Sequence, residues 1–187
     1  RWTPVDRSTN DHGTPGGAGA SGRRRRPSVP DSRPPRPGGA TLARMSDGAR
    51  RWRTSARLRP LVSGIWCWSS PAGPAGTHQG VSSAHLTVVL CLDGAVDLLA
   101  APDPRRGPGR FTASAAGLHA APAVLATGTR QAGMQLEMTW RGARPLLGLP
   151  AGELAGDVVD LALLLPGLDT LLDRLRAEPG WAGRCAL

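Results

Sequence analysis

Residues 85–100 read HLTVVLCLDGAVDLLA, and this stretch decides the class of fold. Residues 85–92 form an apolar run rich in β-branched side chains, which is typical of a buried strand. Asp93-Gly94 follows, and this pair is the strongest two-residue hairpin signal because both positions tolerate a positive φ angle. Residues 95–100 are then expected to form the return strand. We therefore predict an antiparallel pair of strands here.

A second strand signal lies at residues 133–140, which read GMQLEMTW. Apolar side chains alternate with mostly polar ones, so that Met134, Leu136, Met138 and Trp140 share one face and Gln135, Glu137 and Thr139 share the other. This period of two predicts a half-buried strand. The composition also favours strands, more weakly, at 61–68, 111–117 and 118–127, a loop at 69–80 and a turn-rich connection at 102–109.

After Arg141 the apolar period becomes helical. We predict short helices over 143–147, ended by Gly148, and over 150–155, followed by a helical or mixed segment at 157–165. Residues 168–178 carry a leucine stripe at helical spacing, formed by Leu168, Leu171, Leu172 and Leu175. This stripe is interpreted as domain core, although it could also serve as a dimerisation helix.

Strands followed by helices indicate an α+β domain. We expect a small antiparallel β-sheet or partial barrel followed by short helices, with a disordered N-terminal extension. Gly and Pro contribute 25 and 18 of the 187 residues. Residues 1–44 contain too few apolar side chains to offset the entropy of ordering. We expect Met45 to be the native start and residues 1–44 to be translated upstream sequence, which N-terminal sequencing of the native protein tests.

The positive charge is concentrated in the first third of the chain. Residues 1–59 hold 14 arginines and four acidic residues, whereas residues 60–187 hold nine arginines and ten acidic residues. The nearly neutral part offers no electrostatic reason to bind nucleic acid. The run Arg23–Arg26 could form an electrostatic arm, but no aromatic residues are interleaved with it to stack on bases. We interpret it as a solvated tail.

Cys67, Cys91 and Cys185 are far apart in sequence and show no metal-ligand spacing, so they are interpreted as small buried hydrophobic side chains in a reducing cytosol. No apolar stretch approaches the roughly 20 residues that span a membrane. No secretory signal is recognisable at the N-terminus either. A cytoplasmic location without membrane association is therefore expected.

Catalytic patterns are weak in this sequence. His78, His85 and His119 could converge as ligands of a metal, as in cupin-type enzymes, but the paired-histidine spacing is absent, and His12 lies in the extension. Asp93 is interpreted as a turn residue and Asp97 as a polar strand residue. We expect no enzyme activity, no catalytic or metal-binding residue and no cofactor.

The most specific pattern lies at residues 131–165. There a strand ends in a Gly-Ala-Arg turn, formed by Gly142-Ala143-Arg144, and Leu146-Leu147-Gly148 follows. A Pro-Ala-x-Glu-Leu-Ala-Gly motif comes next, formed by Pro150-Ala151-Gly152-Glu153-Leu154-Ala155-Gly156. The block ends with Val158-Val159-Asp160-Leu161. This block resembles the end of the N-terminal effector and dimerisation domain of AraC-type bacterial transcription regulators. Shorter pieces at 78–80, 83–94, 102–104 and 117–119 are similar to the same domain. Pro145 departs from the pattern and is expected to shorten its helix.

The resemblance implies a domain that senses a small-molecule effector and precedes two helix-turn-helix units. Residues 181–187 (WAGRCAL) resemble the start of the linker to those units. On this basis we expect a fragment without the C-terminal helix-turn-helix domain. Its partners would be an unidentified effector, a second copy of the chain, and promoter DNA contacted through the missing domain. No DNA-contacting or effector-binding residue can be transferred from the family.

We therefore divide the chain into an extension (1–60), an effector-sensing domain (61–180) and the start of a linker (181–187). Two alternatives stay open. One is a cupin-like metal-binding enzyme, which should bind a divalent metal stoichiometrically. The other is a nucleic-acid-binding protein that acts through its basic tail, in which case deletion of residues 1–44 should abolish salt-sensitive DNA binding.

Overall fold

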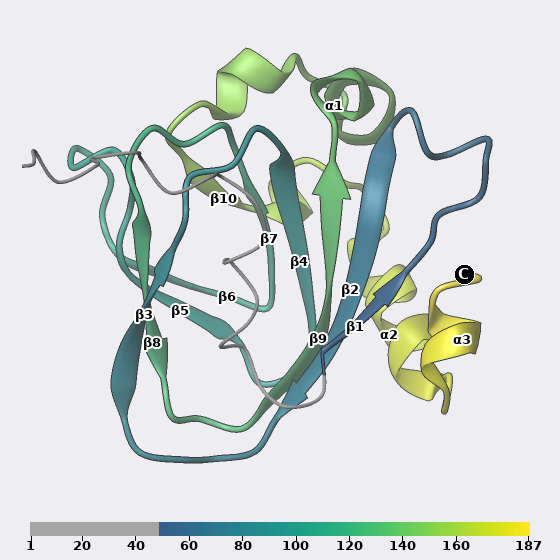
Figure 1. The fold of residues 1–187 in the computed structure, drawn as a ribbon, viewed down its shortest axis with the longest axis horizontal. Helices are drawn as coiled ribbons and strands as arrows, with labels where there is room; N and C mark the ends of the chain where they lie inside the picture. The colour runs from purple at the N-terminus through teal and green to yellow at the C-terminus, as the bar shows by residue number, and fades with distance from the viewer. Residues whose placement is uncertain (1–48) are drawn as a thin grey trace, which may run out of the picture. The chain divides into compact units, whose positions relative to one another are not determined.

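A computed structural model describes residues 49–187 of the chain, and Figure 1 shows their arrangement. The expected native start at Met45, the arginine run and His12 lie outside the described residues. The described part holds ten strands, all paired antiparallel, in two sheets, with short helices mainly toward its C-terminal end. The predicted antiparallel strands with short helices after most of them are confirmed, although strand β10 (Val158–Asp160) follows the first two helical segments. The strands form two sheets rather than the one small sheet or partial barrel that we expected.

The six-stranded sheet has the order β1-β2-β9-β4-β7-β10. Its strands are β1 (Arg50–Trp52), β2 (Val62–Ser70), β9 (Gln131–Met138), β4 (Leu86–Asp93), β7 (Ala113–Ala116) and β10 (Val158–Asp160). The four-stranded sheet has the order β3-β8-β5-β6. Its strands are β3 (Gly76–Gly80), β8 (Ala123–Thr127), β5 (Val96–Ala100) and β6 (Gly109–Phe111).

The turn at Asp93-Gly94 does not form the predicted hairpin. Gly94 does adopt a positive φ of 75°. However, β4 pairs with β9 and β7, and β5 pairs with β6 and β8 in the other sheet. Both edges of β4 are therefore already occupied, and the turn carries the chain from one sheet to the other. A local turn signal specifies the bend but not the strand that will be the partner.

Two further segments differ from expectation. Residues 76–80, expected within a loop, form β3 and pair with β8. Residues 50–52, expected within the extension, form β1 and pair with β2. The Arg51 guanidinium lies 5.6 Å from the ring of Trp66, and one of its nitrogens lies 3.6 Å from a Glu137 carboxylate oxygen. The contacts that hold β1 are therefore made with residues of other strands. The local sequence of residues 50–52 carries no strand pattern that would reveal them.

The helical segments follow the predicted positions with shifted ends. They are α1 (Trp140–Leu147), the 3-10 turns η1 (Ala151–Leu154) and η2 (Leu161–Leu163), α2 (Leu168–Ala177) and α3 (Trp181–Arg184). Trp140 begins α1 and is 63 % exposed, so its predicted place on the buried face of the strand is wrong. The helix also runs through Pro145 to Leu147, and Gly148 follows as expected.

The helices cover one face of the six-stranded sheet. Met134 and Met138 of β9 pack in a buried cluster with Leu90 of β4 and with Leu168, Leu172 and Leu175 of α2. The leucine stripe therefore belongs to the core, as interpreted, with Leu171 only partly buried. In Figure 1, α2 and α3 lie on the side of this sheet that faces away from the four-stranded sheet.

The three cysteines are free thiols. Cys67 and Cys91 are buried, as predicted. The fold also brings Cys67 of β2 close to Cys185, which follows α3, with 3.5 Å between the two sulfur atoms. Over residues 49–187, no helix has the length and apolar character needed to cross a membrane.

Candidate functional site

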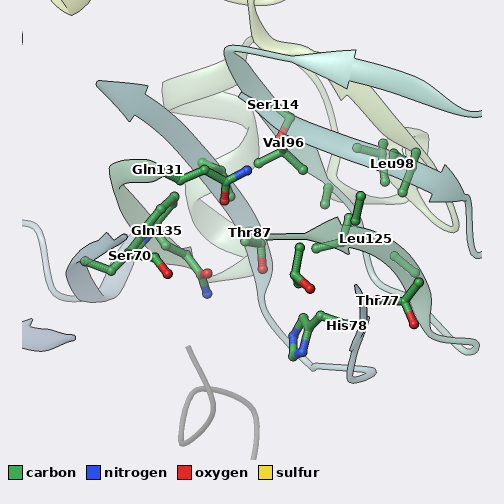
Figure 2. Close-up of a pocket in the computed structure, with 18 of the residues that line it drawn as sticks. Ser70, Thr77, His78, Thr87, Val96, Leu98, Ser114, Leu125, Gln131 and Gln135 are labelled. Atoms are coloured by element: carbon green, nitrogen blue, oxygen red, sulfur yellow. The ribbon is translucent and has the colours of Figure 1, made fainter. Parts of the chain in front are cut away.

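A cavity of about 440 Å³ lies between the two sheets, on the side of the six-stranded sheet opposite the helices. Both sheets contribute to its walls, as Figure 2 shows. The period of two explains how one strand can serve both sides. In β9, Met134 and Met138 face the helices, whereas Gln131 and Gln135 line the cavity.

The wall formed by the six-stranded sheet is polar and uncharged. It carries hydroxyl and amide side chains from four strands, namely Ser70 of β2, Thr87 of β4, Ser114 of β7, and Gln131 and Gln135 of β9. Trp68, Val89, Ala116 and Val158 complete this wall. The polar residues alternate with the core residues of the same strands, and so they lie on the cavity face of the sheet.

The wall formed by the four-stranded sheet is mainly apolar. Val96, Leu98, Ala123 and Leu125 lie on it, and Thr77 and His78 of β3 contribute polar groups. Leu98 and His78 both pair with Leu125 in the ladder, and this register places the three side chains side by side. In Figure 2, Leu98 and Leu125 lie across the cavity from Gln131, Gln135 and Ser70.

The polar groups of the cavity differ in whether the protein itself satisfies them. Gln131 Nε2 donates hydrogen bonds to the Ala95 carbonyl oxygen at 2.5 Å and to Thr129 Oγ1 at 3.3 Å. Across residues 49–187, no side-chain hydrogen bond is found for Gln135, Ser70, Thr87 or Ser114. These four groups therefore depend on whatever fills the cavity for their hydrogen bonds.

Two nitrogen atoms of lining residues are buried without a partner among the described residues, Trp68 Nε1 and His119 Nδ1. Burial lowers the pKa of His119, and the neighbouring Asp157 carboxylate partly opposes this effect. The neutral imidazole is therefore favoured in the folded protein. Because one nitrogen of a neutral imidazole accepts and the other donates, His119 can hydrogen-bond an uncharged group.

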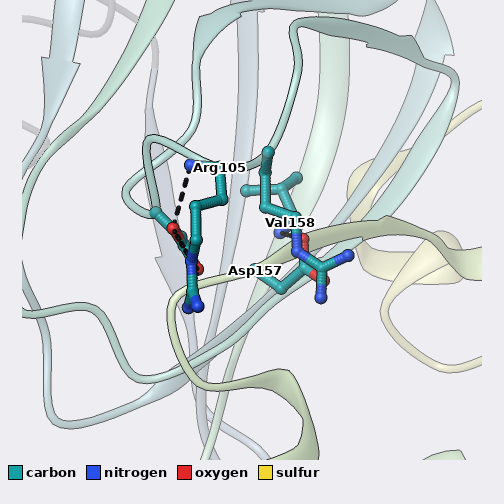
Figure 3. A network of polar contacts seen from close by, with 5 residues as sticks. Arg105, Asp157 and Val158 are labelled. Atoms are coloured by element: carbon teal, nitrogen blue, oxygen red, sulfur yellow. Dashed lines mark hydrogen bonds and ion pairs between the residues drawn. The ribbon is translucent and has the colours of Figure 1, made fainter.

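Ion pairs connect one rim of the cavity to the loop between β5 and β6. An Arg106 nitrogen lies 3.0 Å from an Asp157 carboxylate oxygen, and the Val158 amide donates to Asp157 Oδ1 at 2.9 Å. In the same network, Arg105 Nη2 donates to Asp103 Oδ2 at 2.7 Å, and this pairing lowers the pKa of Asp103 to about 2. Figure 3 shows these contacts, with Asp157 next to Val158, which lines the cavity.

The residues weighed in the sequence have distinct places. His78 and His119 line the cavity, and His85 is absent from its lining. Asp93 pairs with Arg130 at 2.9 Å and Asp97 with Arg110 at 2.6 Å, in agreement with their structural interpretation. A group of three or more His, Cys, Asp or Glu side chains that could hold a metal ion does not occur within residues 49–187.

The sequence did not identify Gln135, Thr87 or Ser70 as site residues. Gln135 stood on the polar face of a predicted strand, and Thr87 is the polar member of an otherwise apolar run. A polar position inside a β-branched run was the available signal. This signal indicates that one side chain has polar surroundings. It does not predict that a second sheet lies opposite that side chain.

Comparisons with known proteins are sparse. No protein-family model matches the chain, and no curated protein matches it. Among solved structures, the crystal structure of a cupin domain from Bordetella pertussis Tohama I is similar with a TM-score of 0.31 and 16% sequence identity. That match covers 49% of this chain and 94% of the cupin domain.

Proposed function

We propose that the chain is the effector-sensing part of an AraC-type transcription regulator and that the effector binds in the cavity between the two sheets. The observation that carries the proposal is the wall of hydroxyl and amide groups on β2, β4, β7 and β9. Gln131 is hydrogen-bonded within the protein, whereas Ser70, Thr87, Ser114 and Gln135 find no side-chain partner among the described residues. A cavity that combines apolar surface with a few convergent polar groups has the character of a small-molecule site. The sequence resemblance at residues 131–165 supplies the link to regulators.

Binding is favoured over catalysis by the chemistry of the lining. Among residues 49–187, those that line the cavity include neither a carboxylate nor a cysteine. His78 and His119 are the titratable side chains among them, and acid-base catalysis requires a positioned group of suitable pKa at the reacting atoms. Side chains with hydroxyl and amide groups can orient a ligand without activating it.

The position of the helices suggests how the binding of a ligand in the cavity changes the helical part of the domain. Strands β2, β4 and β9 carry cavity residues on one face and contact α2 and the residues around α3 on the other face. A ligand that draws Gln135 toward itself acts on the same strand that carries Met134 and Met138 against the helices. Such a ligand would shift the population between two helix arrangements, to the extent that it binds one of them more tightly.

Pairing of two copies through the leucine stripe of α2 is the less favoured part of the proposal. Leu168, Leu172 and Leu175 are each no more than 5 % exposed, because they pack in the core of their own domain. A second copy would have to dock elsewhere. Sedimentation velocity of the purified chain measures whether dimers form at all.

The regulator assignment is tested by the coding sequence that follows codon 187. Two helix-turn-helix units in the same frame are expected there. The protein that contains them should bind promoter DNA with an affinity that changes when the effector is added. Coding sequence of an unrelated kind, or none, would remove the regulator assignment and leave the cavity as a ligand site of a different protein.

A further inference from the structure

The described residues that line the cavity between the sheets include no Arg, Asp or Glu. Their titratable side chains are those of His78 and His119, and burial favours the neutral form of His119. A charged group transferred from water into such surroundings loses hydration without gaining an ionic partner, which is costly. Carboxylate, phosphate and ammonium groups are therefore poor ligands for this cavity.

The two walls differ in the groups that they offer a ligand, although Thr77 and His78 add polar groups to the mainly apolar wall of the four-stranded sheet. On the six-stranded sheet, Gln135 offers an amide N–H donor and a carbonyl acceptor, and Ser70, Thr87 and Ser114 offer hydroxyl groups. On the four-stranded sheet, Leu98 and Leu125 offer only apolar surface across the cavity (Figure 2). A ligand that satisfies both walls has hydrogen-bonding groups along one side and hydrocarbon along the other.

We infer that the ligand is a small uncharged molecule with carbonyl, amide or hydroxyl groups that contact Gln135 and an apolar side that contacts Leu98 and Leu125. The inference rests on the proposed function, because it specifies the ligand of the same cavity. The volume of about 440 Å³ falls within the usual range for small-molecule sites. Gln135 is the residue that sets the preference for a neutral polar group, since its amide has no other partner among residues 49–187.

The test is a screen of small fragments against the whole 187-residue chain by ligand-observed NMR. The fragments form matched sets that share one hydrocarbon skeleton: benzamide and benzyl alcohol as neutral members, benzoate as the anion and benzylamine as the cation. Neutral members are expected to bind at least tenfold more tightly than the charged members of the same set. Binding of benzoate or benzylamine as tightly as benzamide would overturn the inference while leaving ligand sensing intact.

Substitutions assign the binding to the cavity. Gln135→Leu should weaken benzamide binding about fivefold to tenfold, as expected for the loss of one hydrogen bond. Gln135→Glu keeps the shape but adds a carboxylate, so it should move the preference toward benzylamine. Gln79→Leu is the matched control, because Gln79 lies exposed on β3 and does not line the cavity. It should leave every affinity unchanged.

Two further outcomes of the fragment screen would contradict the inference. Neutral fragments that bind equally well to the wild-type chain and to both Gln135 variants would lie away from the polar wall, and the inference would fail. Absence of binding by every fragment, charged or neutral, would remove the cavity as a ligand site and with it the sensing role. The unfolding temperatures of the variants establish that they are folded before affinities are compared.

Discussion

At the scale of single residues, Gly117 shows how closely the chain is packed beside the cavity rim. A Cβ atom at this position would overlap the backbone carbonyl group of Leu154. The Gly117 amide also donates a hydrogen bond to the Asp157 carbonyl oxygen at 3.1 Å, which holds the two segments together. Only glycine allows this approach, because the neighbouring atoms are backbone and cannot rotate away.

Gly117→Ala is therefore expected to lower the free energy of unfolding by about 1–3 kcal/mol, because β7 and η1 must separate. Urea unfolding followed by circular dichroism measures this. Gly152→Ala is the matched control, since nothing lies within 4 Å of a Cβ atom there. It should change stability by less than about 0.5 kcal/mol. Equal effects at the two positions would show that the contact with Leu154 is not tight.

His119 makes the stability of the domain depend on pH. Its pKa is lowered below the ordinary value of 6.5 by burial, so the unfolded chain binds a proton there more readily than the folded protein does. Stability is therefore fully present above about 6.5 and decreases as the pH falls below that value. Asp157, which pairs with Arg106, limits the decrease because its carboxylate favours the protonated imidazole.

We expect His119→Gln to be less sensitive than wild type to a change of pH from above to below 6.5, as measured by urea unfolding on both sides of that value. His85→Gln, which changes a histidine outside the cavity lining, should retain the sensitivity of the wild type. A His119→Gln variant that loses stability as steeply as wild type would assign the effect to other groups.

At the scale of elements, α2 anchors the helical layer to the six-stranded sheet. Leu172 is 3 % exposed and lies in the buried cluster. Leu172→Ala should lower the free energy of unfolding by about 2–5 kcal/mol, since the vacated space is enclosed by packed side chains. Leu163→Ala removes the same atoms from a residue that is 80 % exposed and should cost less than about 0.5 kcal/mol. Thermal or urea unfolding compares the pair, and similar losses would contradict the buried packing of α2.

A pair of free thiols brings the end of the C-terminal helix α3 into contact with the six-stranded sheet. Cys67 and Cys185 have sulfur atoms 3.5 Å apart. Diamide, which accepts two electrons and two protons as a disulfide forms, should join these two residues and leave Cys91 reduced. The reaction should be slow, because burial raises the pKa of Cys67 to about 12 and the thiolate is the reactive species. Mass spectrometry of peptides from the unreduced protein identifies the bond, and a bond to Cys91 would contradict the placement of α3.

At the scale of the whole molecule, charge and fold lie in different parts of the chain. Residues 60–187, which form every described element except β1, are nearly neutral, whereas the excess of arginine is in residues 1–59. If the chain acts as a sensing domain, deletion of residues 1–44 should leave its affinity for DNA negligible, as in the intact chain. Fluorescence anisotropy with labelled duplex DNA at low and high salt measures this. Salt-sensitive binding that disappears on deletion would favour the alternative of a basic nucleic-acid-binding tail.

The elements predicted most successfully carry their signal in their own residues. Strand β4 carries a continuous apolar run rich in β-branched residues, β9 a period of two, and helix α2 a leucine stripe at helical spacing. Strands β1 and β3, with the sequences RRW and GTHQG, carry no such pattern. Their strand conformation is held by pairing with β2 and β8. Their partners lie 13 or more positions away along the chain, and a local pattern carries no information about them.

The site shows the same division. That Gln135 and Met134 lie on opposite faces of one strand could be predicted from the sequence, because successive side chains of a strand point in opposite directions. The change to helical spacing after β9 could be predicted as well, whereas the later strand β10 could not. That the polar face of β9 meets Leu98 and Leu125 across a cavity follows from the three-dimensional fold alone. The reason is that the turn at Gly94 leads to a second sheet, and strand partners are chosen by long-range pairing and burial rather than by the turn between them.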